Sequence, residues 1–288
     1  FEMMNSENLY FYLNGKILKG KEAKISPFDR GFQFSDGVYE TIRWYYGKLF
    51  KLDEHLKRLK RSLAELKINF TASDELDKTI ADLIKINGFI EKHLLVYLQI
   101  TRGDVFPRQH FFPIPDINPT VFISVTPFKP KEHELKEGIK VILCKDFRWG
   151  RCDIKSTMLL PNIMARQEAV EKNAGEAILI RSGFITEGTH TNFFAVKDGK
   201  LYTSPLSNFV LNGVTRKVIL EICKDNGIPV SESEIKADEL KTFDECMITG
   251  TISEVTPVIQ VDNWKIGNGK PGPITLKLQK ILCELISG

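Results

Sequence analysis

Residues 151–160 read Arg-Cys-Asp-Ile-Lys-Ser-Thr-Met-Leu-Leu, which places Lys155 in an apolar setting. This composition predicts a buried segment, and burial lowers the pKa of a lysine because it disfavours the ammonium form. A lysine kept in such a place is either paired with an anion or used as an amine nucleophile. Most lysines in a chain with 40 Lys and Arg residues are solvated, so the interpretation of Lys155 depends on other segments.

Three later segments contain the other groups that a site around Lys155 needs. Glu187 stands in a polar turn, residues 185–192, between strand-like runs. Residues 211–216 (Leu-Asn-Gly-Val-Thr-Arg) join a glycine turn to an amphipathic helix, whose free amides and positive dipole end favour anions. Residues 249–254 (Thr-Gly-Thr-Ile-Ser-Glu) form a second turn rich in hydroxyl groups. Each segment alone is also typical of a surface turn, or of a helix start capped by Thr215.

A lysine amine, a carboxylate and an anion-binding turn are together what a pyridoxal phosphate enzyme requires. The lysine holds the cofactor aldehyde as a Schiff base, the carboxylate keeps the pyridine nitrogen protonated, and the turn anchors the phosphate. Their joint occurrence favours this chemistry more than any single motif does.

Composition narrows the class of protein. The chain has 288 residues, 42% of them hydrophobic, which is enough for two cores. A net charge of +3 gives no reason to expect a nucleic-acid partner. The five cysteines are an odd number without a C-x-x-C pair, which favours a reducing compartment. No run of about 18 apolar residues is present and residues 1–6 do not resemble a signal peptide, so we expect a soluble, cytoplasmic protein without a membrane partner.

The pattern along the chain predicts two domains, 1–126 and 138–288, joined by a proline-containing, charged linker at 127–137. In the first, we expect strands at 10–13, 38–46, 94–101 and 120–126, and helices at 52–66, capped by Asp53, and 74–87. In the second, we expect strands at 140–144, 177–181, 192–196 and 201–203, and helices at 161–175, 215–226 and 274–286. The mixed order favours an α+β architecture over a doubly wound sheet.

The chain resembles fold-type IV pyridoxal phosphate transaminases in residues 29–40, 151–156, 186–189, 212–216 and 253–258. The motifs occur in the family's order, and the resemblance runs from about Tyr12 to Leu282. It implies a small N-terminal α/β domain, a larger C-terminal domain with a mixed-strand pseudo-barrel, and pyridoxal 5'-phosphate as the cofactor.

The resemblance also implies roles for single residues. Lys155 resembles the Schiff-base lysine, which moves the proton between Cα and the cofactor, and Glu187 resembles the partner of the pyridine nitrogen. The phosphate and ring contacts are implied for Arg58, Leu211, Val214, Thr215 and Thr251. Taken alone, Arg58 is also typical of a charge on a helix surface.

Within the family, the closest resemblance is to D-amino acid aminotransferases. Arg108 and His110 match an R-x-H pair that reaches in from the partner subunit to hold the substrate α-carboxylate, and Tyr39 matches a tyrosine that shares this task. His190 and Gly250 depart from the D-enzymes, which carry a small hydroxyl residue and a serine there. Branched-chain enzymes usually carry a tyrosine where this chain has Leu160, which counts against that assignment.

The resulting hypothesis is a homodimeric transaminase that moves an amino group between a D-amino acid, such as D-alanine or D-glutamate, and a 2-oxo acid by a ping-pong mechanism. The alternatives within the fold are a branched-chain L-amino acid transaminase, an (R)-amine transaminase and an aminodeoxychorismate lyase. A non-catalytic binding or scaffold protein is the alternative from another class, since a fold does not determine a function.

Overall fold

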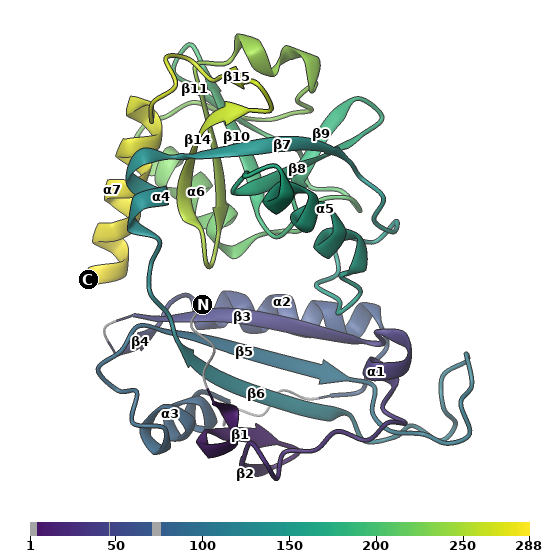
Figure 1. Ribbon diagram of the computed structural model, residues 1–288. Coiled ribbons are helices and arrows are strands. Elements are labelled where there is room, and N and C mark those ends of the chain that lie inside the picture. The colour runs from purple at the N-terminus through teal and green to yellow at the C-terminus, as the bar shows by residue number, and fades with distance from the viewer. Residues whose placement is uncertain (1–4, 46, 71–75) are drawn as a thin grey trace. The chain divides into compact units, whose positions relative to one another are not determined.

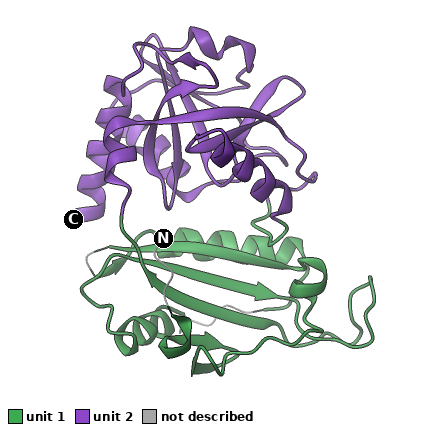
Figure 2. Cartoon of the chain, in the orientation of Figure 1, with its two compact units in different colours: residues 1–129, 154–158 green, residues 130–153, 159–288 purple. Residues whose placement is uncertain are grey.

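The chain divides into two compact units in the computed structural model, which describes residues 5–45, 47–70 and 76–288 (Figure 2). Unit 1 comprises residues 1–129 and 154–158, and unit 2 comprises 130–153 and 159–288. The division at 129/130 falls inside the predicted linker, where residues Glu132–Glu137 form the short helix α4.

The segment 154–158 differs from the expected domain division, which placed it in the second domain. It belongs to unit 1 because strand β3 (Gly37–Tyr45) holds its backbone. The Tyr39 amide donates to the Lys155 carbonyl, and the Thr157 amide donates to the Gly37 carbonyl, both at 3.0 Å. Lys155 therefore reaches unit 1 through backbone pairing that no local sequence pattern indicates.

An antiparallel sheet forms the centre of unit 1, with the strand order β2-β1-β6-β5-β3-β4. Its remaining strands are β1 (Tyr10–Leu13), β2 (Lys16–Lys19), β4 (Lys48–Leu49), β5 (Leu94–Thr101) and β6 (Thr120–Pro127). Asn14 and Gly15 turn β1 into β2 with positive φ angles, the conformation that an Asn-Gly pair favours in a hairpin. Alternate residues of β5 are buried, because successive side chains of a strand point to opposite faces.

Two helices pack against the strands of this sheet (Figure 1). Helix α2 (Leu52–Glu65) packs on β3, and α3 (Leu76–Ile86) packs on β1 and β6. The N-cap of α2 is Lys51 with φ 54°, so the prediction of Asp53 as the cap was wrong. Asp53 lies in the first turn, where its charge favours the helix dipole instead. The predicted ends at Tyr46 and Asp74 lie outside the described residues.

A mixed sheet forms unit 2, with the order β12-β11-β10-β13-β14-β7-β8-β9 and β15 paired to β14. Strands β7–β8, β14–β7 and β11–β12 pair parallel and the other neighbours pair antiparallel, which confirms the α+β prediction. The sheet curls, because β9 also contacts β10. The strands are β7 (Ile139–Lys145), β8 (Glu176–Arg181), β9 (Phe184–Gly188), β10 (Asn192–Lys197), β11 (Lys200–Thr203), β12 (Val230–Glu232), β13 (Glu245–Gly250), β14 (Glu254–Val261) and β15 (Trp264–Lys265).

The two faces of this sheet bury different apolar sets. Val141 and Ile178 join one core with Phe193 and Ile248, whereas Ala177, the next residue on β8, packs with Ala169 of α5. The helices of unit 2 are α5 (Leu160–Glu171), α6 (Val214–Asp225) and α7 (Pro273–Ser287), close to the predicted ranges. Short 3₁₀ turns lie at Ser6–Asn8 and Asp238–Thr242. No helix among the described residues has the length and apolar character needed to cross a membrane.

Candidate active site

Lys155 is held by its backbone and faces an aromatic ring. Its amide donates to Ser62 Oγ of α2 at 3.3 Å, and its Nζ lies 4.3 Å from the centre of the Tyr39 ring. Ile154 and Ser156 are buried, but Lys155 itself is half-buried and Met158 is exposed. The expectation that the whole segment is buried was therefore wrong. Its residues beside β3 are buried or half-buried, whereas Met158 is accessible to solvent.

Arg58 of α2 binds a buried carboxylate on β3. Its Nε and Nη2 donate to the two oxygens of Glu40 at 2.7 and 2.8 Å, the two-point geometry that suits a guanidinium. His55, three residues earlier and therefore on the same helix face, has its Nδ1 2.8 Å from Glu40 Oε2. Arg58 is thus a nearly buried, fixed cation and not a surface charge.

The electrostatics of this cluster favour a charged Glu40–Arg58 pair beside a neutral imidazole. Burial alone would raise the pKa of Glu40, but Arg58 and His55 outweigh it and lower that pKa to about 2. Burial lowers the pKa of His55, and the charges of Arg58 and Lys155 add to this effect against Glu40. Sequence reasoning missed Glu40 and His55, although the first ends the family-like stretch 29–40 and the second lies one helical turn from Arg58.

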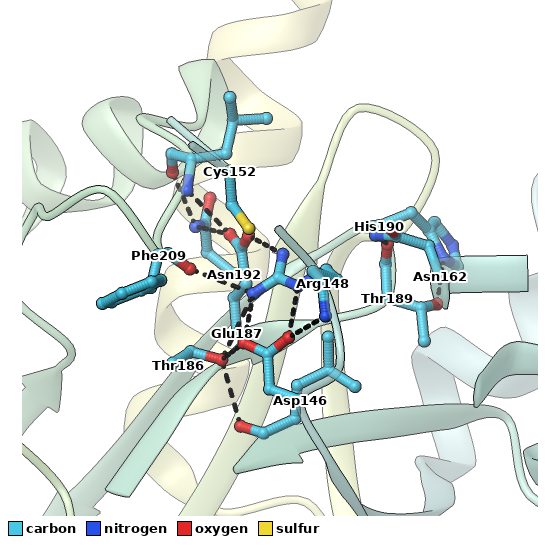
Figure 3. Close-up of polar contacts among 12 residues, drawn as sticks. Asp146, Arg148, Cys152, Asn162, Thr186, Glu187, Thr189, His190, Asn192 and Phe209 are labelled. Atoms are coloured by element: carbon cyan, nitrogen blue, oxygen red, sulfur yellow. Dashed lines mark hydrogen bonds and ion pairs between the residues drawn. The ribbon is translucent and has the colours of Figure 1, made fainter. Parts of the chain in front are cut away.

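Glu187 is the centre of a buried polar network in unit 2 (Figure 3). It lies in β9 and not in a turn as predicted. Arg148 Nη1 donates to Oε1, while Asn192 Nδ2 and the Leu211 amide donate to Oε2 at 3.1 and 3.0 Å. Every donor approaches from the protein, so the orientation of this carboxylate is fixed.

The charges around Glu187 balance. Burial raises the pKa of Glu187, while the Arg148 guanidinium and the Leu211 amide oppose that rise. Arg148 also donates through Nε and Nη2 to Asp146 at 3.0 Å, and Arg181 lies 3.2 Å from the same carboxylate. The guanidiniums of Arg148 and Arg181 therefore face the carboxylates of Asp146 and Glu187. This pairing of opposite charges allows the four side chains to stay charged although the site is buried. Sequence reasoning missed Asp146, Arg148 and Asn192.

The start of α6 presents backbone amides without a side-chain cap. Gly213 is its N-cap residue, and Val214 and Thr215 are buried in the first turn, so Thr215 does not cap the helix. A Cβ at Gly213 would lie 2.0 Å from Asn192 Oδ1, and hence only glycine fits. Asn192 Nδ2 also donates to the Leu211 carbonyl at 2.9 Å, which ties this turn to Glu187.

A buried hydroxyl group lies on the same face of the sheet. Thr249 of β13 is directly opposite Asn192 of β10, so the two side chains share a face. Its Oγ1 is buried and has no hydrogen-bond partner within the part of the chain that the structure describes. Thr251 follows two residues later, in the turn to β14. Orphaned hydroxyl and amide donors beside a fixed carboxylate fit a ligand that carries an anion.

Arg108 and His110 lie together in the loop that joins β5 to β6. The Arg108 guanidinium is 4.1 Å from the Phe34 ring centre, and the His110 ring is 5.5 Å from it. The third residue of the expected carboxylate clamp, Tyr39, contacts the Tyr97 ring at 5.7 Å as well as Lys155 Nζ. Unit 1 thus brings the R-x-H pair together around Phe34.

The two departures from the D-enzyme pattern have different surroundings. His190 Nδ1 lies 3.1 Å from Oε2 of the buried Glu176 and 3.0 Å from Thr189 Oγ1, so its ring is oriented. A Cβ at Gly250 would meet nothing closer than the His190 carbonyl at 3.5 Å. Space therefore does not require glycine at position 250.

Comparison with known families agrees with this fold. The family model described as amino-transferase class IV matches residues 37–261. This chain therefore belongs to the class IV aminotransferases, which confirms the family, the enzyme class and pyridoxal 5'-phosphate as the cofactor.

Among curated proteins, the chain is similar to the D-alanine aminotransferases of Staphylococcus haemolyticus and Bacillus licheniformis. The first is 42% identical over 93% of this chain and 95% of its own length, and the second is 43% identical over 95% of both. Among solved structures, it is similar to branched-chain amino acid aminotransferases. That of Escherichia coli has a TM-score of 0.89 and 28% identity over 97% of this chain and 95% of its own. That of the archaeon Thermoproteus uzoniensis with norvaline has a TM-score of 0.85 and 28% identity over 96% and 94%.

Proposed function

We propose that the protein transfers amino groups between a D-amino acid, such as D-alanine or D-glutamate, and a 2-oxo acid in a ping-pong reaction. The observation that carries the proposal is the pair Arg108 and His110, which is held around Phe34 on a chain whose curated relatives are D-alanine aminotransferases. A guanidinium fork with a neighbouring imidazole suits the α-carboxylate that donor and acceptor share.

Different residues would bind different parts of the cofactor. Lys155 Nζ would hold it covalently, and Arg58, the α6 amides of Val214 and Thr215, and the Thr215 and Thr251 hydroxyl groups would hold its phosphate. Leu211 would pack on the ring. When bound, the cofactor supplies an aldehyde that accepts the amino group and a ring that withdraws electrons from the substrate Cα.

Two of these residues would control the proton on the cofactor ring and the proton that leaves the substrate. Glu187, fixed by Arg148, Asn192 and the Leu211 amide, would keep a proton on the ring nitrogen. Lys155 Nζ would carry the proton that leaves the substrate Cα. The Tyr39 ring, whose centre lies 4.3 Å from Lys155 Nζ, limits the positions that this amino group can adopt.

We further propose a homodimer, with the β5–β6 loop at its interface. This loop exposes three large apolar side chains: Phe106 is 73% exposed, Phe111 66% and Ile114 90%. Side chains of this size gain most from burial against a partner surface.

All five cysteines are free thiols, which supports the cytoplasmic location that their number predicted.

The test is a half-reaction without an acceptor. The cofactor-loaded protein is mixed with D-alanine, L-leucine or (R)-1-phenylethylamine, and the loss of the visible cofactor absorbance is followed. We expect D-alanine to react and L-leucine to be slower by at least about a hundredfold. No reaction with D-alanine refutes the proposal. Pyruvate release from aminodeoxychorismate without an acceptor would identify a lyase instead.

A further inference from the structure

The segment that carries Arg108 and His110 is anchored at its middle by a buried arginine. Arg30 of α1 (Arg30–Phe34) is 3% exposed, and its Nη1 donates to the Gln109 carbonyl at 2.7 Å. Its guanidinium also lies 4.8 Å from the Phe34 ring, the ring on which Arg108 and His110 rest. One arginine thus touches both the backbone between the two residues and the platform beneath them.

Arg30 is itself held in place by a shared carboxylate. Its Nε donates to Asp36 Oδ2 at 2.8 Å, and Arg102 Nε donates to the same oxygen at 2.8 Å. Arg102 completes a fork through Nη2 to Asp36 Oδ1 at 3.0 Å, and its guanidinium stacks 3.7 Å from the Phe112 ring. The loop is therefore held at Gln109 and again at Phe112 by two guanidiniums that one carboxylate fixes.

The start of α1 is equally constrained. Asp29 accepts from the Gly31 amide and from Thr101 Oγ1, both at 2.8 Å, and the Arg30 amide donates to the Gly103 carbonyl at 2.8 Å. A Cβ at Gly31 would lie 2.2 Å from a Thr101 methyl group. The helix that carries Arg30 and Phe34 therefore has little freedom to move relative to β5.

We infer that Arg30 is a positioning residue for the substrate-carboxylate clamp and sets the affinity for amino donor and 2-oxo acid through Arg108 and His110. The inference rests on the proposed role of that pair. Loss of Arg30 leaves Asp36 in its fork with Arg102, so the fold keeps this buried ion pair while the Gln109 carbonyl loses its charged donor. The loop then samples more positions, and each carboxylate ligand must select the competent one.

The test measures the single-turnover half-reaction with D-alanine in four variants: Arg30→Met, Arg30→Lys, Arg108→Ala and Arg30→Met combined with Arg108→Ala. Arg30→Met should raise the half-saturation concentration about tenfold or more and change the limiting rate by less than about threefold. Arg30→Lys keeps a cation beside Asp36 but cannot make the same pair of hydrogen bonds as arginine. Its half-saturation concentration should therefore lie between those of the parent and Arg30→Met. Gln33→Met on the same helix, whose side chain donates to the Pro27 carbonyl instead, is the control and should match the parent.

The double variant separates positioning from general damage. If Arg30 acts through Arg108 and His110, Arg30→Met weakens the binding of D-alanine less in the Arg108→Ala protein than in the parent. Additive losses, or an unchanged half-saturation concentration in both Arg30 variants, overturn the inference. An Arg108→Ala protein that binds like the parent refutes the proposed clamp itself, which is a different failure. Circular dichroism and thermal unfolding of every variant exclude a misfolded sample.

Discussion

The substitution Glu40→Gln tests the buried cluster that holds Arg58. The pKa of Glu40 falls from 4.5 to about 2 in the folded protein, and one pKa unit corresponds to about 1.4 kcal/mol. The folded state therefore gains about 3 kcal/mol from the ionised Glu40 at neutral pH. Glutamine keeps the shape but leaves Arg58 and His55 without their shared anion, so we expect the free energy of unfolding to fall by about this amount.

The lowered pKa of Glu40 also determines how its contribution to stability changes with pH. A carboxylate with a depressed folded-state pKa contributes stability that is complete above pH 4.5 and is lost as the pH falls towards 2. The difference between the parent and Glu40→Gln should hence be constant from pH 7 to about 5.5 and fall to about half by pH 3. Urea unfolding followed by tryptophan fluorescence at several pH values measures this difference.

Glu54→Gln is the matched control, because Glu54 lies on α2 and makes a surface ion pair with Lys57 at 3.1 Å. We expect it to cost less than about 1 kcal/mol. The reasoning is refuted if Glu40→Gln costs as little as this control at pH 7. It is refuted equally if the loss for Glu40→Gln is the same at pH 3 as at pH 7.

Three further predictions concern single residues. Lys155→Ala should leave the melting temperature unchanged and abolish the cofactor adduct that borohydride traps, as measured by mass spectrometry. The control Lys136→Ala, at an exposed position, should keep the adduct. An adduct in Lys155→Ala would mean that another lysine is the attachment point. Glu187→Gln should slow the D-alanine half-reaction about a hundredfold while the visible absorbance of the bound cofactor persists, because a charged hydrogen bond is lost without loss of Lys155; a rate within threefold of the parent contradicts the role of Glu187. Asp36→Asn should lower the free energy of unfolding by about 3 kcal/mol or more in urea at pH 7, because two buried guanidiniums then face each other; a loss below about 1 kcal/mol would show that Arg30 and Arg102 do not depend on it.

Local patterns were sufficient for most elements of the fold. The strand expected at residues 94–101 is β5, and the helix expected from Pro161 is α5, with this proline in its first turn. The mixed order of strands and helices predicted the α+β class, and the family-like motifs led to Lys155, Arg58 and Glu187. These signals are local, since each depends on the side chains of one segment.

The ion pairs around the site lie beyond such reasoning. Arg148 precedes its partner Glu187 by 39 residues, and Glu40 precedes Arg58 by 18. Whether such residues meet depends on the order of strands in a sheet and on the helix that covers it, which no single segment encodes. The same applies to the buried Arg30, because its partner Gln109 lies 79 residues away in a loop. The acceptor on Gln109 is a backbone carbonyl, which every residue carries, so the sequence offers no reason to pair these two.

The discontinuity of unit 1 limits how the gene can be recombined. A fragment that ends at residue 129 would encode β3 and Arg58 but not Lys155, and the complementary fragment would encode Lys155 without the strand that holds its backbone. A chimera built from two homologous aminotransferases by a single crossover near residue 130 would therefore combine the Lys155 segment of one parent with the β3 of the other. Only a design that exchanges residues 154–158 together with the first 129 would preserve the native pairing.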